Sequence, residues 1–128
     1  MVVPKRMEIY YANLSKTDGS VQHGRRPVLV ISNNIANQFS QTVIIAPFTS
    51  QQNDLPTHVA VDLTEVKGSM SVLKCEQITT ISINQLGAKI GKIEDPNVIR
   101  RINRALAIAI GLDDHFNRDI SIGYQQVF

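Results

Sequence analysis

Cysteine and long hydrophobic runs are scarce in this sequence. Cys75 is the only cysteine among 128 residues, which excludes a disulfide within the chain and a zinc site built from cysteines. No apolar run approaches the roughly 18 residues of a membrane-spanning helix, and residues 1–11 do not resemble a secretory signal. We therefore expect a soluble protein of the reducing cytoplasm, with no membrane partner.

The excess of charge is also small, and common enzyme motifs are missing. The chain has 13 Lys and Arg against 11 Asp and Glu, a formal net charge of +2, so a nucleic-acid site must depend on where the cations lie. We find no P-loop, Gly-x-Gly-x-x-Gly, His-Glu-x-x-His or Gly-x-Ser-x-Gly motif. The acids Asp62 and Glu65, near a turn, are more typical of solvated side chains than of metal ligands. We expect no metal and no cofactor.

What is present is a pattern of short strands followed by one long helix. β-rich segments of four to eight residues are bounded by turn residues, and Asp95-Pro96 has the residue types of a helix N-cap and first helical position. Val98, Ile102 and Ala105 then recur at helical spacing. We predict an α+β, mainly β fold: a small barrel of short antiparallel strands with a long C-terminal helix. The domain should span residues 1–112, and residues 113–128 should form a tail. The predicted strands are 8–14, 27–31, 42–49, 59–63, 71–75, 79–82 and 86–93.

Polar residues gather where these strands begin and end. Arg25 and Arg26 precede a buried strand, Thr49 and Ser50 end the next one, and Glu76-Gln77 follows a later strand. If the strand ends meet, they form a groove with cations, hydroxyls and carboxamides. Such an inventory suits phosphates and base edges better than acyl or redox chemistry.

Several motifs then occur together and in one order. They are Arg6-x-Glu8-Ile9-Tyr10, Gly19-Ser20-x-Gln22-x-Gly24-x-Arg26-Pro27, Thr42-x-Ile44-x-Ala46-x-x-Thr49-Ser50, Leu55-Pro56-Thr57-His58-Val59 and Glu76-Gln77-Ile78. Over residues 5–112 the chain thereby resembles the MazF/PemK (Kid) family of toxin endoribonucleases from type II toxin–antitoxin systems. It departs from that pattern at Met7, where relatives usually have glycine, at Lys16, where they have proline, and at Val21, where they have glutamate.

The resemblance implies an SH3-like (CcdB/PemK-type) barrel that works as a homodimer. It implies sequence-specific, metal-independent and ribosome-independent cleavage of single-stranded RNA, chiefly mRNA. Attack by the ribose 2′-OH would leave a 2′,3′-cyclic phosphate and a 5′-OH. It also implies a cognate MazE-like antitoxin whose acidic C-terminal segment fills the RNA groove, with DNA contacted only through that antitoxin.

The same resemblance assigns the site residues. Arg26 and Thr49 are the expected catalytic pair, and His23, three residues before Arg26, is a candidate proton carrier near neutral pH. Because Val21 replaces the loop glutamate, the general base stays open between His23, Arg26 and water. The expected RNA-binding residues are Gln22, Arg25, Asn33, Ser50, Leu55, Pro56, Ser71, Glu76 and Gln77.

Two other functions remain open at this point. Without the loop glutamate, the same fold is compatible with a module that only binds RNA or an antitoxin. A toxin directed at DNA gyrase is a third option, because relatives of this barrel include one. Cleavage of RNA separates the first function from both alternatives.

Overall fold

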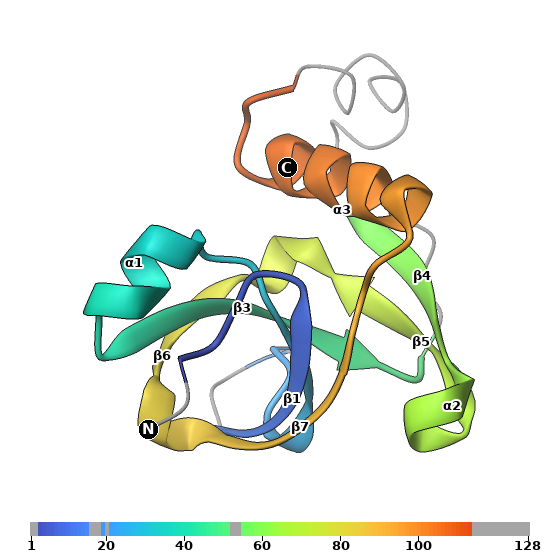
Figure 1. Ribbon diagram of the computed structural model, residues 1–128. Coiled ribbons are helices and arrows are strands. Elements are labelled where there is room, and N and C mark those ends of the chain that lie inside the picture. The colour runs from blue at the N-terminus through green and yellow to red at the C-terminus, as the bar shows by residue number, and fades with distance from the viewer. Residues whose placement is uncertain (1–2, 16–18, 20, 52–54, 114–128) are drawn as a thin grey trace.

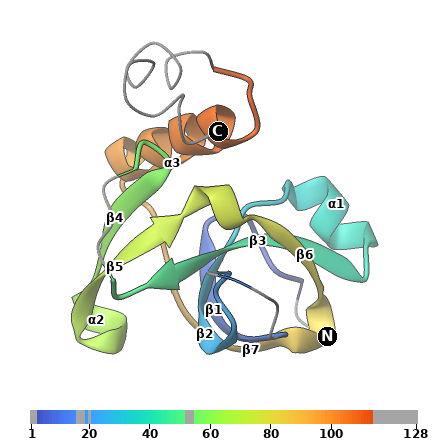
Figure 2. The ribbon, with the colours of Figure 1, turned by 180° about the vertical axis from the view of Figure 1, so that it is seen from behind.

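The computed structural model describes residues 3–15, 19, 21–51 and 55–113. Seven antiparallel strands form one strongly bent sheet of order β4-β5-β3-β2-β1-β7, with β6 paired to β3 outside this row. Figures 1 and 2 show the helix α3 covering one side of this sheet, while β1, β2, β3, β6 and β7 curl into a half-barrel. The predicted fold class is confirmed. The strands are β1 (Glu8–Leu14), β2 (Gly24–Val30), β3 (Thr42–Thr49), β4 (His58–Leu63), β5 (Ser69–Lys74), β6 (Thr79–Ser82) and β7 (Leu86–Lys92).

The helical elements follow their capping residues. In α1 (Asn34–Phe39) the Asn33 side chain accepts a bond from the Ala36 amide at 2.7 Å. In α3 (Pro96–Ala109) the Asp95 carboxylate accepts from Asn97, as its N-cap role predicts. The short elements are α2 (Thr64–Lys67) and the 3-10 turns η1 (Cys75–Gln77) and η2 (Ile83–Gln85). None of the helices in the described part of the chain is long and apolar enough to span a membrane.

Strand β3 belongs to both halves of the sheet. Its first residues, through Ile45, pair with β6, whereas Phe48 and Thr49 pair with Leu73 and Val72 of β5. The change of partner falls at Pro47, which has no N–H to donate to a ladder. At this proline β3 changes its partner from β6 to β5, and the chain passes from one half of the sheet to the other.

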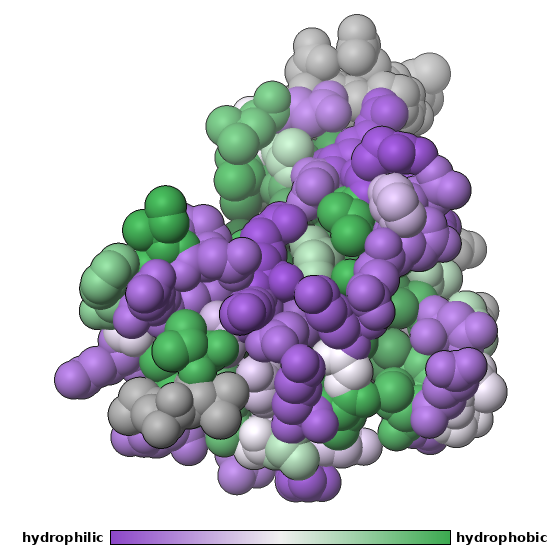
Figure 3. Space-filling view, in the orientation of Figure 1, coloured by the Kyte–Doolittle hydropathy of each residue, from purple (hydrophilic) through white to green (hydrophobic). Residues whose placement is uncertain are grey.

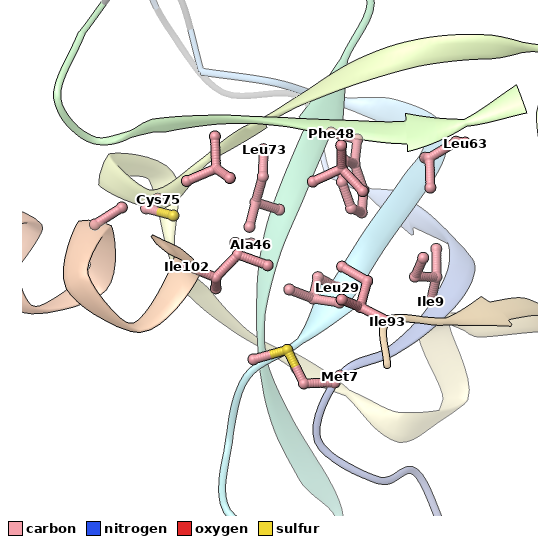
Figure 4. Packing of buried hydrophobic residues seen from close by; sticks show 13 residues of the cluster. Met7, Ile9, Leu29, Ala46, Phe48, Leu63, Leu73, Cys75, Ile93 and Ile102 are labelled. Atoms are coloured by element: carbon pink, nitrogen blue, oxygen red, sulfur yellow. The ribbon is translucent and has the colours of Figure 1, made fainter. Parts of the chain in front are cut away.

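The bend separates two hydrophobic clusters. On β2, Leu29 faces the cluster beneath α3, while Val28 and Val30 face the interior of the half-barrel; all three are completely buried. Figure 4 shows the first cluster, in which Ile102 of α3 meets Cys75 and the core side chains of the sheet. The strand that was predicted to be buried after Arg26 is therefore buried on both of its faces.

Two features at the start of β1 bear on stability. Met7 is buried, yet its φ of 75° places it in the left-handed region, alone among the described non-glycine residues. Next to it, Glu8 accepts from Tyr10 Oη at 3.0 Å and pairs with Lys89 Nζ at 2.6 Å. Burial and the neighbouring Glu8 raise the pKa of Tyr10 to about 12. The structure thus ties the N-terminal end of β1 to β7 through a buried carboxylate.

The predicted boundaries of β2, β4, β5 and β7 differ from those of the structure. β2 begins at Gly24, because Arg25 and Arg26 pair with Asn13 and Ala12 of β1. Residues 34–39, which lie between two predicted strands, form the short helix α1. The helix α2 ends at Gly68, whose φ is 82°. The division at residue 112 stays a prediction, and all of the predicted tail after residue 113 lies outside the described residues.

Candidate nucleic-acid interface

The predicted strand ends do meet, and they line a cleft. The cavity has a volume of about 420 Å³ and lies between the loop before β2, the end of β3 and the segment that runs from β5 into η1. It brings together six of the predicted site residues: His23, Arg26, Gln22, Leu55, Glu76 and Gln77. The other residues that line it are Gly19, Val21, Gln51, His58 and Lys74.

Arg26 is held by two backbone carbonyls. Its Nε donates to the His23 oxygen at 2.9 Å, and its Nη1 donates to the Phe48 oxygen at 3.3 Å. These bonds use two of the five N–H groups of the guanidinium. Pro27 is buried directly behind it. The side chain is therefore fixed in direction while donors remain for an anion.

Thr49 lies next to the carbonyl that holds Arg26, but it is covered. It is 5% exposed, and its Oγ1 accepts from the Gln51 amide at 3.2 Å. Because side chains alternate along a strand, Thr49 shares a face of β3 with Pro47, which lines an adjoining cavity. Arg26 thus bonds to the residue that directly precedes Thr49 in β3, which brings the two predicted catalytic residues close together. Thr49 is not among the described residues that line the 420 Å³ cleft itself.

Glu76 and Gln77 organise the opposite wall. Glu76 accepts from Thr57 Oγ1 at 3.0 Å and lies 2.8 Å from His58 Nε2, whose side chain is only 4% exposed. Gln77 Oε1 accepts from the Gln22 amide at 2.9 Å. This last bond joins the loop before β2 to η1 and so fixes the distance between these two parts of the cleft wall.

A second cavity continues the first along this wall. It is also about 420 Å³, and Val21, Gln22, Glu76 and Gln77 line both cavities. Its remaining lining comes largely from β6 and the end of β1. Because they share these four lining residues, the two cavities form one continuous groove.

His23 and Val21 occupy the rim of the cleft. The Nδ1 atom of His23 lies 3.4 Å from the Val21 oxygen, and both residues are exposed. Val21 leaves 46% of its surface to solvent at a point where a carboxylate was expected. The rim therefore offers an imidazole and an apolar surface.

Five predicted RNA-binding residues lie elsewhere. Arg25 stacks on the Tyr11 ring at 4.1 Å, on the opposite face of β2 from Arg26. Asn33 caps α1, and Pro56 lines a separate cavity with Arg101 and Arg104 of α3. Ser71 is 2% exposed on the core face of β5, and its Oγ has no hydrogen-bond partner among the described residues.

The prediction that Ser71 binds RNA is wrong, because a side chain buried against the core cannot reach a ligand in the cleft. Its face is set by Leu73, two residues along, which is completely buried in the cluster beneath α3. Ser50 is exposed just after β3, and it too is absent from the described lining of the cleft.

Lys74 and His58 are two ionisable lining residues that the predicted site did not include. They face each other across the β4–β5 pair. A signal for Lys74 is present in the strand itself: a single lysine interrupts the apolar run Val72-Leu73-Lys74-Cys75, on the face opposite Leu73. The cleft therefore contains the cations Arg26 and Lys74 against Glu76, the sole acid among its described lining residues.

The cleft's chemistry suits an anionic ligand more than a metal or a thiol nucleophile. No group of three His, Cys, Asp or Glu side chains placed to hold a metal occurs within the described ranges. Burial, and then the charge of Glu76, raises the pKa of the Cys75 thiol to about 12, so this thiol stays protonated at neutral pH. Two cations, carboxamides, two imidazoles and one carboxylate are the groups that remain in the described lining.

Several known proteins resemble this chain in sequence and in fold. The PemK-like, MazF-like toxin family of type II toxin–antitoxin systems matches residues 5–110. Endoribonuclease EndoA of Bacillus subtilis is 41% identical over 116 residues, covering 88% of this chain and 99% of the relative. Endoribonuclease MazF of Staphylococcus saprophyticus is 38% identical over 111 residues, covering 84% and 92%.

A solved structure agrees with these relatives. A mycobacterial endoribonuclease in complex with its cognate antitoxin superposes with a TM-score of 0.70 at 27% identity, covering 86% of this chain and 97% of the other. Fold and site together define the class of a toxin with endoribonuclease activity. The chain belongs to the PemK-like, MazF-like toxin family.

Proposed function

We propose that this toxin cleaves single-stranded RNA, chiefly mRNA, in the cleft around Arg26, without a metal and without the ribosome. The observation that carries the proposal is the fixed guanidinium, which two carbonyls hold at the wall of a cavity lined by a second cation. Donors fixed before the reaction stabilise the charge that develops on a phosphorane. Recognition of unpaired bases by the amides and apolar surfaces of the groove makes the cleavage sequence-specific.

The reaction is an internal transfer at phosphorus. The ribose 2′-oxygen gives up its proton and attacks the phosphorus atom, and the bond to the 5′-oxygen breaks. The leaving 5′-oxygen takes up a proton, so the products carry a 2′,3′-cyclic phosphate and a 5′-OH. Arg26 binds the non-bridging oxygens. The Thr49 hydroxyl accepts from the Gln51 amide and keeps its own hydrogen to donate to the same phosphate. An arginine is a poor base because its pKa exceeds about 12, so we assign Arg26 an electrostatic role.

The 2′ proton needs an acceptor, and the cleft contains two imidazoles. His23 is exposed at the rim, and its own carbonyl positions Arg26. His58 is buried and engaged with Glu76. We assign the acceptance of this proton to His23, because its imidazole is exposed on the lining of the cleft, whereas that of His58 is engaged with Glu76.

Gln22, Gln77, Leu55 and Glu76 read the bases in this proposal. They line the groove, and their carboxamide, apolar and carboxylate groups match the edges and faces of unstacked bases. Arg25, Asn33, Ser50 and Pro56 lie outside the cleft and contribute only if the strand continues beyond it.

The cleavage proposal is tested with the purified chain and a synthetic RNA in EDTA. Cleavage with cyclic phosphate ends is expected, and Arg26→Ala and Thr49→Ala each lower kcat by about 100-fold or more. Lys92→Met serves as a control, because it removes an exposed cation from β7, outside the cleft. A requirement for a divalent metal contradicts the mechanism. Binding of RNA without cleavage by the wild type supports the binding module instead, and gyrase-dependent DNA breaks support the gyrase-directed toxin.

We further propose that the protein is a homodimer. Ile35 and Phe39 lie one turn apart on α1 and are 74% and 81% exposed, and Figure 3 shows hydrophobic residues over α1 and over the C-terminal end of α3. Large exposed apolar side chains on a small domain mark an interface. Light scattering should give the mass of a dimer for the wild type and of a monomer for Phe39→Asp.

The cleft also binds, in this proposal, the acidic C-terminal segment of a cognate MazE-like antitoxin. The mycobacterial neighbour was solved with its antitoxin, and the cleft of this chain has two cations against one acid among its described lining. An acidic segment there would exclude RNA, and DNA would be contacted only through the antitoxin. An acidic peptide from the neighbouring antitoxin gene should inhibit cleavage competitively. An mRNA substrate places the protein in the cytoplasm.

A further inference from the structure

The cavity beside Pro56 lies between α3 and β4, next to the cleft. It has a volume of about 290 Å³, and we call it the helix groove. Strand β4 is at the end of the sheet, next to β5. The lining of the helix groove includes Pro56, Val59 and Ala60 before and within β4, and Arg101, Arg104 and Ile108 of α3. Two arginines therefore face this groove, and no acid occurs among its described lining residues.

The two arginines stand where α3 meets the sheet. Ala105 and Ile108 are buried in that contact, and Arg101 and Arg104 precede them by one turn, on the same side of the helix. Both arginines are exposed. The Nε atom of Arg104 lies 3.8 Å from Asp113 Oδ2, a loose surface pair that contributes little. Both guanidinium groups are therefore available to an anion in the helix groove.

The helix groove and the cleft adjoin each other. His58 lines both of them, and Leu55 of the cleft is followed directly by Pro56 of the helix groove. A ligand strand that passes Leu55 therefore continues over Pro56 towards α3. The cations of the cleft and those of α3 lie along one path, which is the pattern expected for a polyanion rather than for a single anion.

Two polyanions are proposed to enter the cleft, an RNA and the acidic segment of an antitoxin. The RNA fits the helix groove better, because an mRNA continues on both sides of its cleavage site and carries phosphates beyond the cleft. The apolar surface of Pro56 beside the arginines also suits an unstacked base next to its phosphate. The side chains of an acidic peptide have no flat apolar group to place there.

We propose that the helix groove binds nucleotides that flank the cleavage site, and that Arg101 and Arg104 each donate to one phosphate of the strand that leaves the cleft. The inference rests on the proposed cleavage of RNA. No bond forms or breaks in the helix groove, so these arginines add affinity for longer RNA and take no part in the chemistry. The forked guanidinium suits such contacts, because two of its N–H groups can bind one phosphate.

The first experiment measures what extra length contributes to binding. The probes are a short RNA with a 2′-deoxyribose at its cleavage site, and the same RNA lengthened by several nucleotides at the 5′ end or at the 3′ end. In the wild type, lengthening at one of these ends should tighten binding about tenfold. This gain should disappear in the double variant Arg101→Gln/Arg104→Gln, because glutamine keeps the helix propensity and removes the charge.

Arg100→Gln is the matched control. It removes the same charge from the same helix, but Arg100 donates to Asn97 and is not among the described residues that line the helix groove. The control should gain affinity from the added nucleotides as the wild type does. Equal gains in the double variant and the control overturn the proposal.

The salt dependence of binding tests the same contacts. Each phosphate contact contributes about 0.7 to the slope of log K against log salt concentration for a single strand. With the lengthened RNA, the slope should therefore be smaller by about 1.4 in the double variant than in Arg100→Gln. Equal slopes in these two proteins refute the contacts.

Two further measurements separate this proposal from its alternatives. If the double variant loses affinity for an oligoglutamate peptide but keeps the gain from added nucleotides, the helix groove binds protein and the RNA proposal is wrong. Cleavage of the short RNA by the wild type, with the 2′-OH restored, tests the proposed function by itself. Absence of cleavage overturns that function and this inference with it, whereas cleavage with equal gains from length overturns the role of the helix groove alone.

Discussion

Met7 combines a conformation that favours glycine with a side chain that the core requires. Its φ of 75° is in the left-handed region, where a residue with a Cβ pays roughly 1–2 kcal/mol. Its amide donates to the Val30 oxygen at 2.8 Å, and its oxygen accepts from the Ile93 amide at 2.9 Å. These bonds join the ends of β2 and β7, so the backbone cannot relax without breaking them.

The side chain offsets that strain. Met7 is 5% exposed and packs in the cluster beneath α3, and truncation of a buried methionine to alanine typically costs about 2–5 kcal/mol. Met7→Gly loses this packing but relieves the strain, whereas Met7→Ala loses the packing and keeps the strain. Glycine also has the more flexible unfolded chain, which costs it about 0.5–1 kcal/mol.

The two variants should therefore rank in an unusual order. Both should be less stable than the wild type, and Met7→Ala should be less stable than Met7→Gly by about 0.5–1 kcal/mol. Urea unfolding of all three proteins at one protein concentration measures this, because a dimer's stability depends on concentration. The reasoning is refuted if Met7→Ala proves the more stable variant, or if Met7→Gly exceeds the wild type.

Three further predictions concern other residues. Burial alone would raise the pKa of Glu8, but the hydrogen bonds from Lys89, the Lys5 amide and Tyr10, together with the charge of Lys89, hold this pKa below its ordinary value. The stability that the Glu8 carboxylate adds to the folded protein is therefore complete above the pKa of the unfolded chain. It is lost as the pH falls through the pKa of the folded protein. Glu8→Gln should cost about 2 kcal/mol at pH 7, and calorimetry from pH 7 to pH 3 should show the gap to wild type narrowing below the unfolded value. Ser71→Ala should leave RNA cleavage unchanged and raise stability by up to about 1 kcal/mol, since it removes a buried hydroxyl without a partner; a loss of RNA affinity would show that the core face of β5 does reach the ligand. His23→Gln should flatten the pH–rate profile near neutrality, and an unchanged profile would remove His23 from proton transfer.

The strands were predictable wherever local chemistry decides them. β3 begins and ends at the predicted residues, because a β-branched run is bounded by polar residues on both sides. β2 began earlier than predicted, since Arg25 and Arg26 enter the sheet only through pairing with β1. The helix α1 depends on the Asn33 cap. The three asparagines Asn33, Asn34 and Asn37 are equally typical of a loop.

The motifs predicted which residues form the site better than they predicted how these residues are arranged in space. The ordered motifs located Arg26, Gln22, Glu76 and Gln77, which do share the cleft. The position of Lys74 follows from which face of β5 looks outward, and that depends on how β5 pairs with β3 and β4. Such pairings join residues distant in the sequence, so no local pattern determines them. Ser71 was misplaced for the same reason.

The buried thiol of Cys75 makes the chain convenient for labelling. The thiol has no exposed surface, and burial raises its pKa to about 12. It therefore does not react with maleimide or iodoacetamide dyes at neutral pH, because the thiolate is the reactive form. A cysteine introduced at the exposed Gln51 on the cleft lining then carries the sole fluorophore. That fluorophore would report directly on occupancy of the cleft, and on exchange of one occupant for another, while the native cysteine stays in place.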